Sequence, residues 1–282
     1  MLRFARRLTV CLGAILAFGL LAPSVLAAER YFTGTAGASW ADPANWSETS
    51  GGTGGASVPG SGDVAIFDGS SPSCALSGNV TVDGVRLMAG YAGVLDAGAY
   101  ALTVNYAAGS GLLSVAGGEL KLGTGTHTVK GNLSHTGGAI TAQTSKVQFL
   151  APDAASITIS GAVVLNDVKF YHSNSGSSHK TVNVNSLVTA NGSLEVCGYD
   201  VGGWHLYLNG GGEIIAKGEI LGNGKVVRGN TSLTVAGDAA DQGQTNLWGA
   251  PRGCTRWTSL SGPWSTRALS GSATPRPAAT RS

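Results

Sequence analysis

Short runs in which apolar and polar residues alternate occupy the chain between residues 74 and 238. Each run holds two apolar side chains two positions apart, with a Thr, Lys, Gln, Asn or Glu between them. Alternate residues of a strand point to opposite sides of a sheet, so the pattern predicts short strands with one buried and one solvent-facing side. The clearest runs are 79–83, 101–105, 119–123, 146–149, 156–160, 181–185, 193–196 and 232–235.

The spacing of these runs favours stacking. Many of them recur at about 20 residues, a length that suits one turn of a parallel β-helix stacked on the turn before it. Gly-Gly, Asn-Gly and Asp-Gly pairs are spread evenly between them, and 44 of the 282 residues are Gly, which disfavours helix. We predict an all-β fold, a parallel β-helix or β-solenoid. An antiparallel β-sandwich-type architecture is the alternative, because it also uses short strands and turns.

The first 27 residues have the pattern of an export signal. Basic residues within 1–7 precede an uncharged apolar stretch of 14 residues, 8–21, and the sequence Val25-Leu26-Ala27 follows. This stretch has the length of a signal-peptide core and is shorter than the roughly 18 residues of a membrane-spanning helix. We expect residues 1–27 to be a signal peptide that is removed after Ala27, and we expect no transmembrane segment in the remaining chain.

Residues 28–70 differ from the repeats by their aromatic content. Trp40 and Trp46 flank the sequence Asp-Pro-Ala-Asn, and Val58-Pro59-Gly60 leads toward the apolar run 64–67. The first sequence predicts a tight turn that folds both indoles onto one apolar surface. We interpret residues 28–70 as an N-terminal capping segment for β-solenoid repeats over 71–245. A carbohydrate-binding platform on Trp40 and Trp46 is the alternative.

The alternating pattern stops after Trp248. Residues 249–282 contain five Arg, no Lys and no acidic residue, whereas residues 28–248 contain ten basic and sixteen acidic residues. We expect residues 246–282 to be a disordered tail, or an out-of-frame reading of the gene; a basic tail that binds surfaces is the other interpretation.

The charge balance disfavours a nucleic-acid partner. The chain has 18 basic and 16 acidic side chains, and removal of the leader with its three Arg leaves 15 against 16. Nucleic-acid binding depends on the neutralisation of phosphates by many cations. The remaining cysteines, Cys74, Cys197 and Cys254, lack the spacing of a zinc site. A Cys74–Cys197 bridge is the one disulfide considered.

Catalytic and cofactor motifs are absent from the sequence. It contains no Gly-x-Ser-x-Gly, no His-Glu-x-x-His, no phosphate-binding loop and no EF-hand, and each of these is a motif with a defined mechanism. The acidic residues are single and scattered, and the five His lie in polar contexts that predict surface or turn positions. We therefore expect no catalytic residue, metal or cofactor. Because stacked turns bring distant residues together, an enzyme remains the alternative.

One aromatic run offers candidate ligand-binding residues. In 201–208, Trp204, Leu206 and Leu208 alternate with His205 and Tyr207. The first three are expected in the core. His205 and Tyr207 then share the opposite side and join Trp40 and Trp46 as candidates for binding a ligand.

Two stretches resemble a known class of proteins. The sequence from Trp40 to Ser47, with that from Val58 to Asp68, is similar to the N-terminal segment of bacterial secreted or surface proteins with β-helix repeats, of the autotransporter or adhesin type. The stretch from Ser145 to Phe170 resembles a repeat of that class. The resemblance implies a secreted or cell-surface structural or adhesive protein without catalytic activity.

The expected partners are extracellular glycans or other cell-surface components. Self-association through the ends of the stack is also expected, because open ends expose strand edges. A carbohydrate-binding or polysaccharide-degrading protein on the same scaffold is the alternative function.

Overall fold

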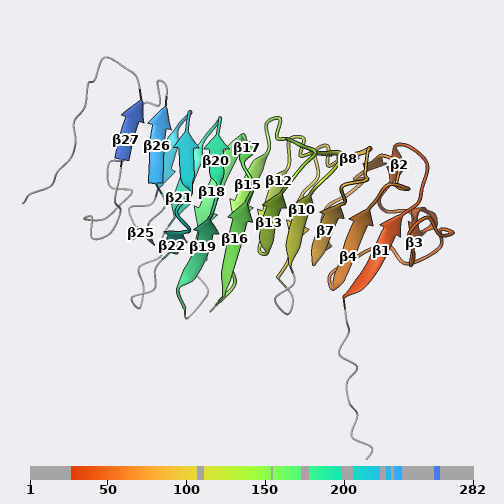
Figure 1. The fold of residues 1–282 in the computed structure, drawn as a ribbon. Helices are drawn as coiled ribbons and strands as arrows, with labels where there is room; N and C mark the ends of the chain where they lie inside the picture. Colours follow the sequence, from red (N-terminus) through yellow and green to blue (C-terminus); the bar gives the residue numbers. More distant parts are fainter. Residues whose placement is uncertain are drawn as a thin grey trace, which may run out of the picture.

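The chain forms an almost purely β structure (Figure 1). The computed structural model describes residues 27–106, 111–153, 155–172, 178–197, 206–222, 227–229, 232–236 and 257–260. These residues form strands β1 to β27 and one short 3₁₀-helix, η1 (Pro43–Asn45). The all-β prediction is confirmed.

The strands belong to four sheets, called A to D. Sheet A contains, in spatial order, β3 (Trp46–Ser47), β1 (Ala28–Phe32), β4 (Asp63–Phe67), β7 (Gly84–Leu87), β10 (Leu112–Val115), β13 (Asn132–His135), β16 (Ser156–Ser160), β19 (Lys180–Val184), β22 (Leu206–Asn209) and β25 (Val227–Gly229). Sheet B contains β2 (Ala38–Ser39), β5 (Cys74–Ala75), β8 (Val94–Asp96), β11 (Glu119–Lys121) and β14 (Ala139–Thr141).

Sheet C contains β6 (Val80–Val82), β9 (Leu102–Val104), β12 (Thr126–Val129), β15 (Lys146–Phe149), β18 (Asp167–Tyr171), β21 (Leu194–Cys197) and β24 (Ile220–Gly222). Sheet D contains β17 (Val163–Leu165), β20 (Leu187–Ala190), β23 (Glu213–Ala216), β26 (Ser232–Ala236) and β27 (Trp257–Leu260).

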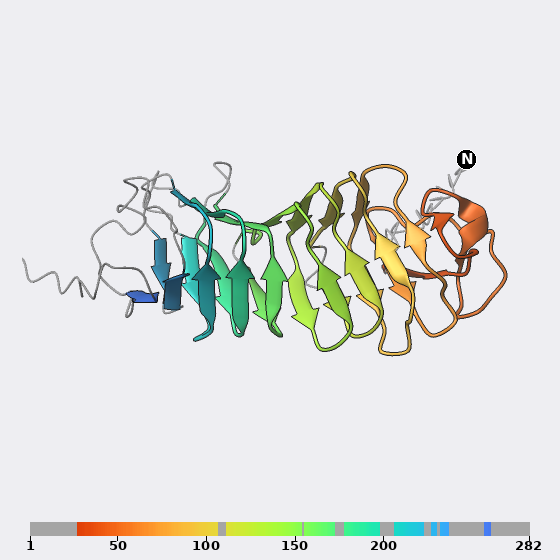
Figure 2. The same cartoon turned by 90° about the horizontal axis from the view of Figure 1, so that it is seen from above.

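Successive strands go to different sheets, and the sheets are parallel. Strands β4, β5 and β6 lie in sheets A, B and C, and β7, β8 and β9 then join the same three sheets. Each such set of three strands is called a layer; Figure 2 shows the layers side by side along the molecule. From β17 onward sheet D receives the middle strand, and β14 and β17 are neighbours without sharing a sheet. Among the described strands only β1 and β3 pair antiparallel, so the antiparallel alternative is wrong.

The core consists of columns of side chains that superpose from layer to layer. One column of sheet A is entirely buried, and its members are Ala65, Val85, Leu113, Leu133, Ile159 and Val184. The residues that follow them on each strand, such as Ser114 after Leu113 and Ser134 after Leu133, point to the other side of the sheet and are half-buried. The alternation predicted from the sequence is confirmed in these strands. Each buried aliphatic side chain contributes about 1.5–3 kcal/mol to folding.

Aromatic side chains fill the end of the molecule beside β1. The ring of Trp46 lies edge-on to Trp40 at 4.7 Å and to Phe32 at 5.2 Å between centroids. The turn that places them begins at Asp42, whose Oδ1 accepts a hydrogen bond from the Ala44 nitrogen at 2.9 Å. The Trp46 Nε1–H then donates to the Trp40 carbonyl at 2.7 Å. The Asp-Pro sequence therefore brings the two indoles together, as predicted.

Two predicted segments lie mostly outside the described residues. They are the signal peptide, of which only Ala27 is described, and the tail from 246 to 282, of which only 257–260 is described. Those four residues form β27, which pairs parallel to β26. In the part of the chain that the structure describes, no helix has the length and apolarity needed to span a membrane.

Candidate binding face

An uncharged ladder of polar side chains covers the outer side of sheet A. Its members, called the polar ladder, form two columns: Ser114, Ser134 and Ser160, and Asn132, Thr158 and Asn183. They come from β10, β13, β16 and β19, and all six are half-buried. Neighbouring strands are about 4.8 Å apart, so the four strands present hydroxyl and amide groups over roughly 14 Å.

Only some groups of the polar ladder are used within the protein. Asn132 Oδ1 accepts a hydrogen bond from the Thr158 nitrogen at 2.8 Å, and Ser160 Oγ donates to the Leu133 carbonyl at 3.3 Å. Each hydroxyl and amide has further hydrogen-bonding capacity. No outward position of these four strands carries a charged side chain. The ladder is therefore suited to a neutral partner rich in hydroxyl groups.

An ion pair borders the polar ladder on the side of the N-terminal strands. Arg86 on β7 contacts Glu29 on β1 at 3.0 Å, across the intervening strand β4. The Tyr31 hydroxyl donates to the other carboxylate oxygen of Glu29 at 3.1 Å. Burial, followed by this bond to Glu29, raises the pKa of Tyr31. Glu29 thus contacts both Arg86 and Tyr31. The charges of this ion pair lie beside the polar ladder and not within it.

The four candidate ligand-binding residues have different positions. Trp40 and Trp46 are 2% and 0% exposed, so neither offers the open ring face that stacking on a sugar requires. Tyr207 is half-buried on β22 and shares the outer face of sheet A, in register with Thr181. Its ring lies edge-on to His179 at 5.1 Å. His205 lies outside the described residues.

A cluster of titratable groups occupies the outer side of sheet C. Glu195 on β21 contacts Lys169 on β18 at 2.9 Å and Lys146 on β15 at 3.3 Å, so one carboxylate joins three strands. The Cys197 thiol donates to Glu195 at 3.3 Å. The Lys169 ammonium also lies 5.1 Å from the centre of the Tyr171 ring.

The protonation states of this cluster do not suit catalysis at neutral pH. Burial opposes the charge of Glu195, but hydrogen bonds from Lys169 and Cys197 and the charge of Lys169 outweigh it and lower the pKa of this carboxyl. Burial, together with the hydrogen bond to Glu195 and its charge, raises the pKa of Cys197 to about 11. A general acid needs a raised carboxyl pKa and a nucleophilic cysteine a lowered one. Both shifts have the opposite sign.

Other carboxylates are also held by lysines. The pKa of Asp96 is lowered. Burial alone would raise it, but hydrogen bonds from Lys121 at 2.8 Å and from the Gly98 amide outweigh that effect. Hydrogen bonds from Lys180 and Ser178 lower the pKa of Asp153. Within the described ranges, no three His, Cys, Asp or Glu side chains are grouped as metal ligands. Carboxylates of this kind act as ion-pair partners.

Cys74 and Cys197 are free thiols. Cys74 is buried on β5 of sheet B, whereas Cys197 is on β21 of sheet C, half-buried. The Cys74–Cys197 bridge considered from the sequence is therefore wrong.

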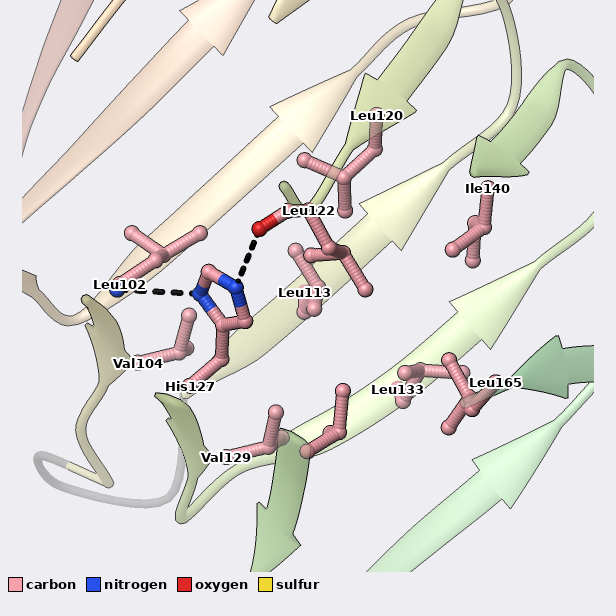
Figure 3. A pocket seen from close by; sticks show the side chains of 11 residues that line it. Leu102, Val104, Leu113, Leu120, Leu122, His127, Val129, Leu133, Ile140 and Leu165 are labelled. Atoms are coloured by element: carbon pink, nitrogen blue, oxygen red, sulfur yellow. Dashed lines mark hydrogen bonds between the residues drawn. The ribbon is translucent and has the colours of Figure 1, made fainter. Parts of the chain in front are cut away.

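A small cavity lies inside the stack at the junction of sheets B and D. It measures about 10 Å³ and is lined by apolar side chains such as Leu120, Ile140 and Leu165, together with His127 (Figure 3). Both ring nitrogens of His127 are hydrogen-bonded, to the Leu102 nitrogen and to the Leu122 carbonyl. A cavity of this size is at the lower limit for one water molecule, so it is a packing defect and not a ligand site.

A larger groove lies on the surface beside β6, the first strand of sheet C. It measures about 330 Å³, and its walls include Trp40, Val58, Pro59 and Thr81. None of its lining residues is charged. This groove is the second candidate site.

Polar side chains that bond the backbone of a neighbouring layer are a structural feature that the sequence analysis does not predict. Such bonds run from the Val94, Ala101, Thr158, Gly161 and Ser193 nitrogens to the side chains of Ser73, Asn79, Asn132, Ser186 and Asp167. Each acceptor is a short polar residue at or next to a strand end, 21 to 26 positions from its donor. A search for Ser, Asn and Asp residues that lie beside the apolar runs, 21 to 26 positions from the neighbouring run, would identify these acceptors.

Comparison of the chain with family models, with curated proteins and with solved structures finds no match. The assignment of a role therefore depends on the geometry described above.

Proposed function

We propose that this chain is a secreted or cell-surface β-solenoid with a structural or adhesive role and no catalytic activity, and that its polar ladder binds extended, uncharged glycans. The observation that carries the proposal is the register of sheet A. Paired parallel strands place hydroxyl and amide groups in two columns of three matching positions, over four successive strands, without a charge among them.

The order of the strands supports the solenoid. Every third strand from β4 to β22 returns to sheet A, and buried columns run through the layers. In such a stack each layer contacts only its neighbours, and a repeated outer surface follows from the repeated backbone. Export fits the basic and apolar leader of residues 1–27, whose pattern is that of a signal peptide.

Repetition explains how weak contacts would give useful affinity. One neutral hydrogen bond contributes about 0.5–1.5 kcal/mol in water, which is too little to hold a sugar alone. A polymer that contacts the polar ladder on several strands gains binding free energy from each contact, and it loses its translational freedom only once. The absence of charge on the ladder favours neutral glycans over polyanions.

Binding to immobilised polymers tests the proposal. We expect retention on neutral polysaccharides such as a β-glucan or mannan, weaker retention on polygalacturonate and heparin, and no release of reducing ends. Ser134→Glu puts a charge in the middle of the ladder and should weaken binding about tenfold or more. Thr103→Glu is the matched control, because Thr103 is half-buried on the outer side of sheet C.

Two results would contradict the proposal. The first is retention that Ser134→Glu and Thr103→Glu reduce equally, because the ladder would then not be the binding face. The second is turnover of a polysaccharide that is abolished when one acidic residue is changed to its amide, because the protein would then be an enzyme.

A further inference from the structure

We propose that the groove beside β6 is an acceptor site for a β-strand: it binds an extended, uncharged segment of another polypeptide, which pairs with the free edge of sheet C. The proposal is independent of glycan binding by the polar ladder. It depends on the layer at this end of the molecule, on the backbone of β6 and on the walls of the groove.

Among the described strands, the layer that contains β1 and β2 has no member in sheet C. Sheets A and B extend beyond β4 and β5 by β1 and β2, whereas sheet C ends at β6. Between β2 and β4 the chain forms η1 and β3, and β3 pairs with β1 in sheet A. The place beside β6, level with β1 and β2, is where the groove lies.

The backbone of Thr81 presents a donor and an acceptor to this place. Val80 donates to the Ala101 carbonyl and Val82 accepts from the Asn105 nitrogen, so Val80 and Val82 bond to β9. In a parallel ladder the residue between them directs its N–H and C=O to the opposite edge. Among the described residues neither group of Thr81 has a hydrogen-bond partner. An added strand would satisfy both.

The walls of the groove suit the side chains of such a strand. Val80 is 8% exposed, and Trp40 and Val58 line the groove beside it. Apolar side chains of an incoming strand would cover Val58, which is half-buried, and the exposed part of Val80. The hydroxyl of Thr81 is exposed on the outer side, where a polar residue would extend its column. An uncharged lining favours an uncharged segment over an acidic or a basic one.

The sheet itself indicates which sequence it accepts. Its first three strands read Val-Thr-Val, Leu-Thr-Val and His-Thr-Val, with the Thr residues in one outward column and the Val residues in one buried column. The partner chemistry is therefore an extended segment with an apolar residue, then Thr, then Val. Addition of a strand to a sheet edge is a known mode of peptide recognition, in which backbone bonds give affinity and alternate pockets give specificity.

Calorimetric titration with a synthetic peptide tests the site. The probe is a synthetic peptide with blocked ends and the sequence of residues 99–106, which contains Leu-Thr-Val. Within the protein, this segment pairs with the other edge of β6. We expect it to bind the wild-type protein and the Thr81→Val variant, which keeps the backbone N–H. Thr81→Pro removes that N–H, which β9 does not use, and should weaken binding about tenfold.

A second variant blocks the groove without touching β6. A side chain added at Gly60 would meet no atom within 4 Å, so Gly60→Phe should fold and fill the groove, again with a loss of about tenfold or more. Circular dichroism and melting temperature show whether each variant is folded. The proposal is overturned if the peptide does not bind the wild-type protein, or if Gly60→Phe binds it undiminished. It is also overturned if a neutral oligosaccharide displaces the peptide and binds Thr81→Pro as it binds wild type, since the groove would then be a sugar site.

Discussion

The ring of His127 accepts a hydrogen bond from the backbone nitrogen of Leu102, which belongs to the neighbouring layer, at 3.1 Å. The other ring nitrogen, Nε2, lies 2.7 Å from the Leu122 carbonyl. A ring that accepts at Nδ1 and donates at Nε2 is the neutral tautomer. The contact between His127 and Leu102 therefore exists only while the imidazole is uncharged.

Stability should decrease when the pH falls below neutrality. Burial lowers the pKa of His127, although the bond to Leu122 opposes the shift. Between the lowered folded pKa and the unfolded value of about 6.5, the unfolded chain binds more protons than the folded one. The free energy of unfolding therefore falls as the pH drops through about 6.5. Urea denaturation at several pH values between 7.5 and 5 measures this slope.

The variant His127→Leu should remove that slope. The substitution leaves the Leu102 N–H without its acceptor and lowers the free energy of unfolding by about 1–3 kcal/mol at neutral pH. The stability of the variant should then not fall further through this site when the pH is lowered. Val164→Ala, at a side chain that is 51% exposed, changes no titratable group and is the control that should keep the wild-type slope. If His127→Leu keeps it as well, His127 is not the titrating group.

Gly98 and Gly123 make a matched pair for the stacking of turns. Both have left-handed backbone, with φ of 58° and 65°. A Cβ on Gly123 would overlap the carbonyl oxygen of Gly98, whereas a Cβ on Gly98 would meet nothing within 4 Å. Gly98→Ala should cost about 1–2 kcal/mol for its φ alone, and Gly123→Ala at least about 3 kcal/mol because the turns must also separate. Denaturation midpoints give the comparison, and equal costs would show that the turns are not closely stacked.

The strands were predictable where every second residue is apolar. The run 156–160 coincides with β16, and 181–185 is shifted from β19 by one residue at each end. Such runs are recognisable because the alternation of apolar and polar residues follows the alternation of buried and exposed side chains. Only Leu133 of β13 is buried, so its sequence lacks an apolar period that could be recognised. Its position is set by pairing with β10 and β16.

The histidines show what the sequence does not reveal. The sequence predicts all five at the surface or in turns, but His127 and His172 are 2% exposed. The prediction is wrong for His127, which lies within β12, whereas His172 is buried in the connection that follows β18. In the run Thr126–Val129, His127 stands two positions before the buried Val129, a signal of an inward position that could have been used. For the polar ladder the sequence predicts only a polar outer side, since the register of its members depends on which strands pair.

Core packing should depend on aromatic stacking between layers. Phe149 and Phe170 are partners on β15 and β18, with ring centroids 5.3 Å apart and planes at 18°. Both are fully buried. Phe170→Ala should therefore cost about 3–5 kcal/mol, measured by urea denaturation. Val164→Ala, at a side chain that is 51% exposed, is the control and should change stability by less than about 0.5 kcal/mol. A similar small loss for Phe170→Ala would contradict the packing described.

Glu195 should control the reactivity of Cys197. Burial, the hydrogen bond to Glu195 and its charge raise the thiol pKa to about 11. Glu195→Gln removes the charge, so the pKa of Cys197 should fall and its alkylation by iodoacetamide at pH 8.5 should accelerate roughly five- to tenfold. Peptide-resolved mass spectrometry follows Cys197 alone, with buried Cys74 as an internal reference that stays unmodified. Asp96→Asn breaks an ion pair on sheet B and should leave the rate unchanged. If Glu195→Gln also leaves it unchanged, burial alone protects the thiol and the carboxylate does not.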